Sequence, residues 1–344
     1  MKNDMYDIKK VIKGGRLQQK AASLVGVDFS TTSTKVVRLK KIKEELVLMG
    51  IDLLPAVDFG AKACRIELPR NMTAHYGCLA YTGKSSVVRM VNASLSDGQT
   101  ELSERKLREL LNVGDDYRVS ATLAKKGQGR HDSSFLAAAI PEDDLHFLLS
   151  MFPSGPPAPA SVEVAGLSFV SAFINARGDE CQGETVCLIE TGESASHFVF
   201  INDGVPALVG KFDFGGSTLR EKVVKDLGVD DELAGTILTD SSINISTSMN
   251  DVMTPFLKQL SISKDFIERH QGCQVSKVYV SGGTSLLPHW PSVVEQMLHA
   301  EALPWSPFEN IRYDHPDIVP EHLSNQVTRF AAAAGAAIGG LGES

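Results

Sequence analysis

The sequence is short of cysteine and contains no long hydrophobic run, and each shortage excludes a class of protein. Its 344 residues include five cysteines, at positions 64, 78, 181, 187 and 273, with no paired metal-ligand spacing. An odd number of scattered thiols argues against a disulfide framework and is typical of a reducing cytosol. No apolar run reaches the roughly 18 residues that a membrane-spanning helix needs, and we find no signal-peptide pattern. We therefore expect a cytoplasmic protein without a transmembrane segment of its own.

Positive charge is also scarce. The 34 lysines and arginines are outnumbered by 42 aspartates and glutamates, and no basic stripe crosses the body of the chain. Because binding to a phosphate backbone depends on clustered Lys and Arg, we expect no nucleic acid partner. The nine histidines lack the spacing of a zinc site, and no Gly-x-Ser-x-Gly sequence indicates a serine hydrolase. What the chain has is a hydrophobic content of 43%, enough for the cores of two ordinary domains.

Residues 1–22 form the one basic segment, in which Lys and Arg outnumber Asp and apolar residues lie between them. Such a segment can form an amphipathic helix on an anionic membrane, or it can be a solvated leader. We favour the leader, because Gly14 and Gly15 break the helical pattern early.

Two stretches predict β-hairpins with polar turns. In residues 24–37, apolar runs flank a cluster of hydroxyl residues with Asp28 at its start and Lys35 at its end. Residues 186–201 repeat the pattern with Glu190, Gly192 and further hydroxyls. Turns of this kind present backbone N–H groups and hydroxyls to an anion, and a nearby carboxylate can hold a cation through water. Both stretches are therefore candidates for binding a metal-bound phosphate.

A third candidate is the glycine turn in residues 278–288, where a buried strand runs into Gly282 and Gly283. Glycines at such a place let the backbone approach a flat ligand closely.

By contrast, residues 77–85 only resemble a P-loop, because five residues separate its two glycines where that motif has four. We expect strand, turn and strand there.

The order of two phosphate hairpins and a glycine turn resembles the actin-like ATPase superfamily, and within it most closely the PilM family of type IV pilus assembly proteins. FtsA-like division proteins are the next most similar. The resemblance extends from about Leu24 to Gly340 and is strengthened by the FGG turn at residues 214–219 and the small-residue helix at residues 330–339. It implies an α/β, actin-like ATPase fold of two similar domains around a nucleotide cleft, with an inserted small α+β subdomain, called 1C.

The same resemblance implies boundaries for these parts. We expect a leader at 1–22, the first domain (1A) at 23–100, subdomain 1C at 101–160, the first domain again at 161–180, the second domain at 181–318, and a C-terminal helix packing on the first domain at 319–344. Within 1C we expect a helix over 101–113 with Ser103 as its N-cap, strands over 117–124 and 134–140, and a helix over 141–152.

Carried over from the family, Asp28 and Glu190 would lie near a magnesium ion through water. Lys35 would neutralise phosphate charge. The residues implied in nucleotide binding are Asp28, Ser30, Thr31, Thr32, Ser33, Lys35, Glu190, Gly192, Ser194, Ser196, Glu232, Gly282, Gly283 and Thr284.

The chain departs from the family pattern at three contact points. Ser30 replaces a usual Gly, Glu190 replaces a usual Asp, and the Lys that follows the adenosine-side Glu is absent after Glu232. Because phosphoryl transfer depends on accurate positioning of metal and water, we expect slow or absent ATP hydrolysis and assign no catalytic residue beyond Glu190 at the family Asp position. Retention of ATP or ADP with magnesium stays open.

The resemblance implies a cytoplasmic scaffold that is peripheral at the inner membrane through its partner. It would bind the N-terminal cytoplasmic tail of a PilN-like membrane protein, and other pilus assembly proteins, at a groove formed by residues 81–91 and 117–140. An active ATPase, a small-molecule kinase of the same superfamily and an FtsA-like protein are the alternatives.

Overall fold

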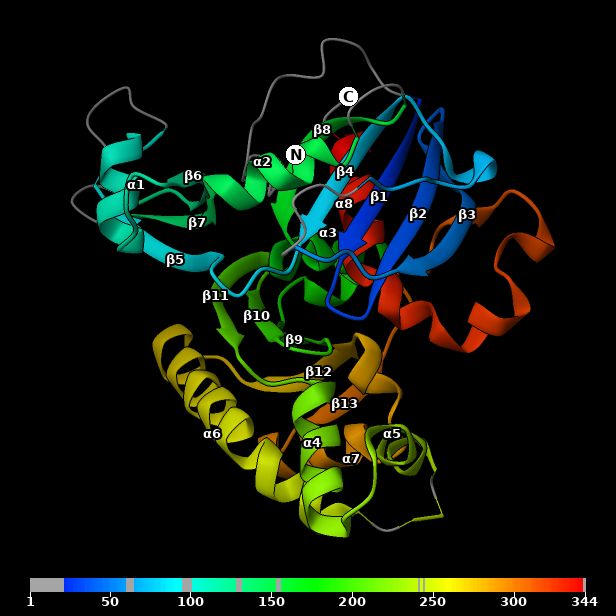
Figure 1. Ribbon diagram of the computed structural model, residues 1–344. Coiled ribbons are helices and arrows are strands. Elements are labelled where there is room, and N and C mark those ends of the chain that lie inside the picture. The colour runs from blue at the N-terminus through cyan, green and yellow to red at the C-terminus, as the bar shows by residue number, and fades with distance from the viewer. Residues whose placement is uncertain are drawn as a thin grey trace. The chain divides into compact units, whose positions relative to one another are not determined.

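The computed structural model describes residues 22–59, 65–94, 101–127, 132–152, 156–240, 242–243 and 245–342, so the basic segment lies outside the described residues except for Ala22. The chain divides into two compact units. The first comprises residues 1–176, 307–324 and 332–344, and the second comprises residues 177–306 and 325–331. Figure 1 labels their elements.

A six-stranded sheet forms the centre of the first unit, in the order β14-β3-β2-β1-β4-β8. Its strands are β1 (Ser23–Phe29), β2 (Ser33–Ile42), β3 (Glu45–Pro55), β4 (Tyr76–Tyr81), β8 (Ala158–Val164) and β14 (Arg312–Tyr313). The first three form an antiparallel meander, and β4 and β8 then continue the sheet in parallel to β1. This order places the expected first hairpin at the centre of the sheet.

Two helices are rich in small residues: α8 (Ala331–Gly342) packs on this sheet, and α3 (Ala165–Arg177) packs on α8. Gly26 on β1 lies so close to α8 that a Cβ there would be 1.9 Å from the Ala333 carbonyl oxygen. Gly335 of α8 lies equally close to the Ser168 carbonyl of α3. The small residues of the C-terminal helix are thus required by backbone contact.

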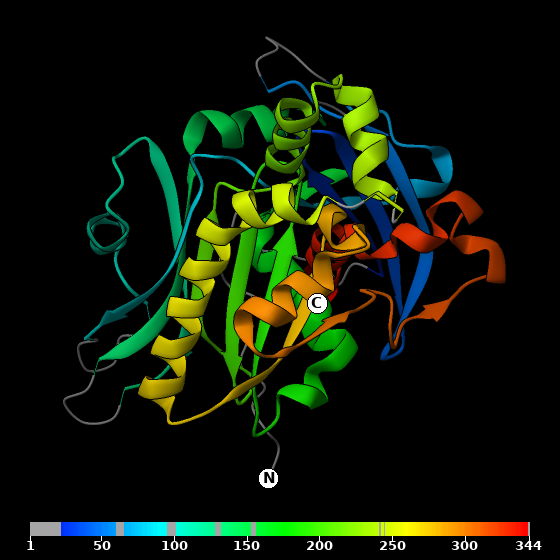
Figure 2. The same ribbon diagram turned by 90° about the horizontal axis from the view of Figure 1, so that it is seen from below.

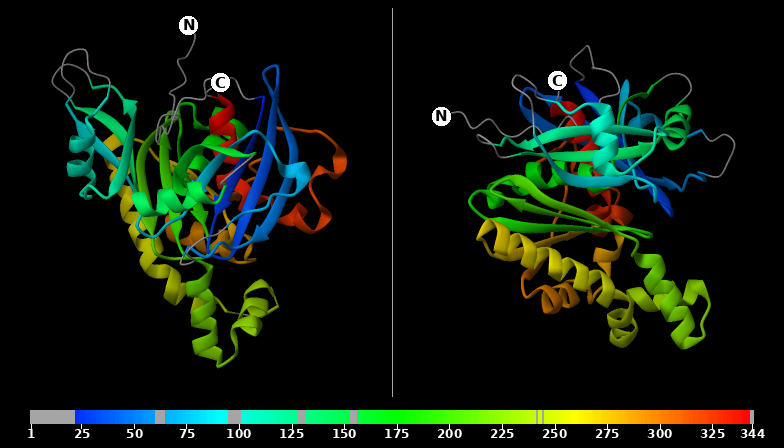
Figure 3. Two further views of the ribbon diagram at one scale, coloured as in Figure 1. Left: turned by 45° about the horizontal axis from the view of Figure 1, so that its top comes forward. Right: turned by 90° about the vertical axis from the view of Figure 1, so that its left-hand side faces the viewer.

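A small subdomain of the first unit is built on the three-stranded antiparallel sheet β5-β7-β6, with β5 (Val87–Ala93), β7 (Ser133–Pro141) and β6 (Tyr117–Lys125). Figure 3 shows α1 (Glu104–Leu111) against one face of this sheet. Leu107 and Leu111 of α1 pack on Phe135 and its neighbours. Ser103 caps α1 by accepting a hydrogen bond from the Lys106 N–H at 3.3 Å, as expected.

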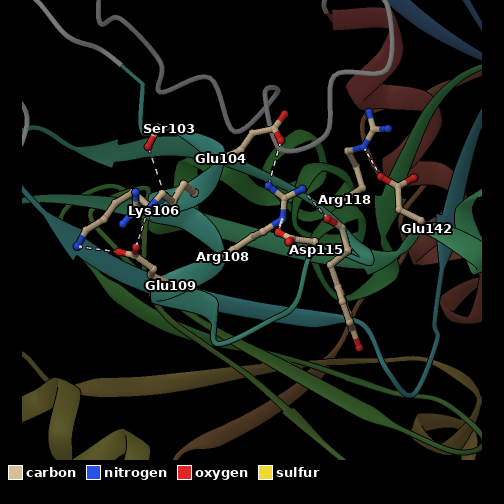
Figure 4. A network of polar contacts seen from close by, with 10 residues as sticks. Ser103, Glu104, Lys106, Arg108, Glu109, Asp115, Arg118 and Glu142 are labelled. Atoms are coloured by element: carbon tan, nitrogen blue, oxygen red, sulfur yellow. Dashed lines mark hydrogen bonds and ion pairs between the residues drawn. The ribbon is translucent and has the colours of Figure 1, made fainter.

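The outer face of α1 is a solvated network of charges (Figure 4). Arg108 pairs with Glu104 at 3.1 Å, and Lys106 pairs with Glu109 at 3.8 Å. Exposed pairs of this kind contribute little stability, about 0.3–0.5 kcal/mol each. Their role is to keep this face polar while the other face of α1 enters the core.

The second unit repeats the arrangement of the first. Its sheet has the order β11-β10-β9-β12-β13, with β9 (Thr185–Thr191), β10 (Ser196–Asn202), β11 (Val205–Phe212), β12 (Val275–Ser281) and β13 (Glu301–Pro304). Again three antiparallel strands are followed by two strands parallel to the first of them. The internal repeat puts the second hairpin where the first unit has β1 and β2.

Four helices of the second unit are α4 (Gly216–Leu227), α5 (Asp231–Thr239), α6 (Ser246–Gln271) and α7 (Trp290–Leu298). Figure 2 shows α6 running along the strands of this sheet. Phe214 stacks between Phe256 of α6 at 5.2 Å and Trp290 of α7 at 6.1 Å. This aromatic stack anchors the FGG turn in the hydrophobic core of the second unit. Of the short 3-10 helices, η3 (Gly178–Cys181) and η4 (Gly283–Leu286) belong to the second unit, and η2 (Arg70–Met72) and η5 (Pro316–Ile318) belong to the first. The last, η6 (Glu321–Phe330), has residues in both units.

Two boundaries differ from expectation. The small sheet includes β5, which precedes residue 101, and β8 of the large sheet begins at Ala158. The reason is that strand partners are far apart in the sequence, so local pattern does not assign a strand to its sheet.

None of the described helices combines the length and hydrophobicity that a membrane crossing requires.

Candidate functional site

The first hairpin brings its predicted residues together. Asp28 on β1 stands directly opposite Lys35 on β2, with the Lys35 ammonium 3.2 Å from Asp28 Oδ2. The same ammonium donates to the Ser30 hydroxyl. Ser30 in turn donates from its hydroxyl to the Ser33 carbonyl oxygen at 2.9 Å. The expected acid and base thus form an ion pair inside the hairpin.

The side chains of this ion pair are almost completely shielded from water. The Asp28 and Lys35 side chains are only 6% and 10% exposed. Asp28 Oδ1 is buried and has no hydrogen-bond partner among the described residues. A magnesium ion held through water would need a carboxylate oxygen open to its hydration shell. As placed, Asp28 offers one oxygen to Lys35 and encloses the other, so it does not fit that role.

The tip of the hairpin is open. Thr31 and Thr32 are exposed, and they lie between the ends of β1 and β2. The hydrogen bonds that the structure gives for this tip close it from Ser30 to Ser33 and leave the two threonines outside. Hydroxyls and backbone N–H groups at such a turn suit an anion such as phosphate.

The second hairpin is held mainly by its own contacts. Gly192 donates its N–H to the Ala195 carbonyl at 3.0 Å, and its carbonyl accepts from the Thr284 hydroxyl at 3.0 Å. The hydroxyl of Ser196 is fully buried and donates to the Phe214 carbonyl at 2.7 Å. Ser196 and Thr284 therefore join the hairpin to the FGG turn and the glycine turn, while Ser194 is only half-buried.

The FGG turn closes over this hairpin. Gly216 donates its N–H to the Gly192 carbonyl at 3.0 Å, and Ser217 donates both its N–H and its hydroxyl to the Glu193 carbonyl at 2.9 Å. The Glu193 carboxylate lies against Gly216, where a Cβ would be 2.8 Å from its Oε2. Arg220 of α4 holds that carboxylate and pairs with Asp231 at 2.8 Å. An internal carboxylate thus occupies the cradle at the start of α4.

Glu190, which we expected at the family Asp position, is 9% exposed on β9. It stands opposite His197 on β10 and Ser281 on β12. Burial, assisted by the charge of Lys211, lowers the pKa of His197 to about 3, so its imidazole is neutral. A neutral histidine cannot balance the negative charge of Glu190, so that charge is left to other partners.

The two glycines of the third candidate have different environments. Gly282 has φ +89°, and a Cβ there would lie 2.4 Å from the Thr191 carbonyl oxygen. Gly283 is exposed, and the nearest atom to a Cβ there is Nε of Arg329, at 3.9 Å. Gly282 is therefore a packing residue, and Gly283 is the one open to a ligand. Glu232 lies apart from this turn in the sequence, exposed on α5.

Sequence reasoning missed an aromatic cluster in the first unit. Phe59, 36% exposed, contacts Phe29, Tyr81 and Phe147, with ring centroids 6.4, 5.5 and 5.3 Å apart. The Tyr81 hydroxyl donates to Asp144 of α2 (Glu142–Ser150). The Tyr81 ring crosses Gly83, where a Cβ would lie 2.0 Å from it. Gly83 of the apparent P-loop is thus a packing glycine, and only the isolated aromatic residues could have signalled the cluster.

Comparison with known proteins decides the family. The model of the family described as type IV pilus assembly protein PilM matches residues 161–340, more than half of the chain. The chain belongs to the PilM family. No curated protein matches it.

A solved complex shares the fold of this chain. A structure described as the PilM-PilN type IV pilus biogenesis complex is similar with a TM-score of 0.76 and 15% identity, covering 94% of this chain and 99% of that one. EutJ from Carboxydothermus hydrogenoformans has a TM-score of 0.46 and 15% identity, covering 98% and 94%. MreB 5 of Spiroplasma citri bound to AMPPNP has a TM-score of 0.46 and 9% identity, covering 92% and 95%. This PilM-family chain has an actin-like ATPase fold.

Proposed function

We propose that this PilM-family chain is a cytoplasmic scaffold of a type IV pilus assembly complex, and that it binds the N-terminal cytoplasmic tail of a PilN-like inner-membrane protein. The observation that carries the proposal is its family membership, together with its likeness across 94% of the chain to a PilM-PilN complex. On this proposal the chain reaches the inner membrane through its partner.

The aromatic cluster of Phe29, Phe59, Tyr81 and Phe147 is the anchor that we propose for the tail. Its Phe59 ring is the most accessible one, at 36%. Strand β5 follows Tyr81 after a short turn and lies at one edge of the three-stranded sheet. Extended peptides bind at open sheet edges and insert apolar side chains into neighbouring pockets, and aromatic anchors often contribute most of the affinity.

In this proposal the main role of the chain is to bind its partner, and turnover of a nucleotide is not required. The hairpin residues carry departures at Ser30 and Glu190, and Glu193 occupies the cradle beside Gly216. Hydrolysis of ATP needs a positioned metal and water, so we propose that turnover is slow or absent and that any bound nucleotide has a structural role.

The test uses a fluorescent peptide copied from the cytosolic tail of the PilN-like protein of the same organism. Anisotropy titrations compare the wild type with Phe59→Ala and with Phe266→Ala. Phe266 is the matched control, because it is a half-exposed phenylalanine of α6, 50% accessible, in the second unit.

We expect Phe59→Ala to weaken peptide binding about tenfold, as loss of an aromatic anchor does, and Phe266→Ala to leave it unchanged. Thermal unfolding of each variant shows whether it is folded. Equal loss in both variants, or no binding by the wild type, would refute the proposal.

A further inference from the structure

The counter-ion of Asp28 is built into the chain. Lys35 faces Asp28 across the two central strands, and the two side chains make an ion pair of 3.2 Å with little exposure to water. In an interior of low dielectric, such a pair persists because neither charge can be left alone. The hairpin is therefore neutral at the point where the family resemblance implies a metal.

Ser30 gives the lysine a second anchor. The Lys35 ammonium donates to the Ser30 hydroxyl as well as pairing with Asp28. A glycine at this position would offer no such acceptor. The Ser30 hydroxyl thus helps to hold the ammonium on the carboxylate.

A divalent cation does not fit beside this arrangement. Asp28 Oδ2 is taken by the ammonium, and Oδ1 is buried without a partner among the described residues. A second cation at the carboxylate would meet the charge of Lys35 at close range, where repulsion is strong. Magnesium also keeps several waters, for which the enclosed oxygen leaves no room.

We propose that Lys35, fixed by Ser30, takes the place of a divalent cation at Asp28, so that the first hairpin accepts a phosphate at Thr31 and Thr32 without metal. The inference rests on the proposed function, because it describes the nucleotide that this scaffold retains. It predicts that nucleotide binding is independent of magnesium.

The first experiment needs no nucleotide. Manganese(II) binding to the full chain is followed by the loss of the free-ion electron paramagnetic resonance signal. We expect no binding to the wild type, a gain of affinity of about tenfold or more in Lys35→Met, and loss of that gain in Asp28→Asn/Lys35→Met. Lys41→Met, which removes a lysine outside this site and leaves the ion pair in place, is the matched control and should behave as the wild type.

The second experiment measures ADP binding by calorimetry, once with magnesium chloride and once with EDTA. The wild type should give the same affinity in both, and Ser30→Gly, which keeps both charges, should become dependent on magnesium. Ser30→Gly also serves if Lys35→Met does not fold.

Three results would overturn the inference: manganese binding by the wild type that Asp28→Asn abolishes, no gain in Lys35→Met, or ADP binding by the wild type that requires magnesium. Each is separate from failure of the proposed function, since binding of the PilN-like tail is measured on the same preparations.

Discussion

The hydroxyl of Tyr81 donates a hydrogen bond of 2.5 Å to Oδ2 of Asp144, and this bond ties strand β4 of the large sheet to helix α2. Burial, with Asp144 as the next cause, raises the pKa of Tyr81 well above its usual value, so the phenol stays protonated as a donor. Hydrogen bonds to charged groups contribute about 1.5–3 kcal/mol.

Tyr81→Phe should therefore lower the free energy of unfolding by about 1.5–3 kcal/mol in urea denaturation. Tyr313→Phe is the control, because Tyr313 is 40% exposed. Equal stability of the two variants would show that the Tyr81 bond contributes nothing.

Breaking the Asp28 and Lys35 pair from one side leaves a buried charge alone. Lys35→Met should cost about 3–5 kcal/mol of unfolding free energy, whereas Asp28→Asn/Lys35→Met should recover much of that loss. Lys41 pairs with Glu44 at 3.5 Å on the surface, so Lys41→Met should cost less than about 1 kcal/mol. A double variant as unstable as the single one would contradict the coupling.

The neighbouring glycines Gly282 and Gly283 provide a matched pair of substitutions. Gly282→Ala adds a Cβ at positive φ, 2.4 Å from the Thr191 carbonyl oxygen, and should destabilise the protein by about 1–3 kcal/mol or more. Gly283→Ala meets only the Arg329 side chain and should change stability by no more than about 0.5 kcal/mol. Chemical denaturation of both variants compares them, and the reverse order would be inconsistent with this packing.

His197 should make the protein less stable in mild acid. Its folded pKa of about 3 lies below the usual value of 6.5, so between these values the unfolded chain binds the proton and the folded protein does not. The free energy of unfolding should then fall with pH from about 6.5 downward, by up to about 1.4 kcal/mol per pH unit from this group.

Replacing His197 removes this contribution. Urea unfolding at pH 7 and pH 5 should show a smaller difference for His197→Gln than for the wild type. His146→Gln, at a side chain 75% exposed, should keep the full difference. An unchanged pH dependence in His197→Gln would mean that the imidazole is protonated in the folded protein.

Local pattern was enough to predict both hairpins, the Ser103 cap and the small-residue C-terminal helix, and the structure confirms them. Each of these depends on residues close together in the sequence, so their spacing carries the information. The hairpin register places Asp28 opposite Lys35. From the sequence we assigned Asp28 to a metal and Lys35 to phosphate, and we did not predict that the two residues pair with each other.

The remaining contacts depend on residues far apart in the sequence. Tyr81 and Asp144 are separated by 63 positions, and Glu193 and Arg220 by 27. No periodicity or motif joins such pairs, because the fold alone brings their elements together. For the same reason the sequence did not show that Glu193 fills the cradle beside Gly216.

The most direct test of the account is calorimetric titration of the purified chain with the cytosolic tail peptide of its PilN-like partner and, separately, with Mg-ATP. We predict saturable binding of the peptide and weak binding of Mg-ATP. Tight binding of Mg-ATP without binding of the peptide would contradict it and indicate an enzyme of the actin-like superfamily.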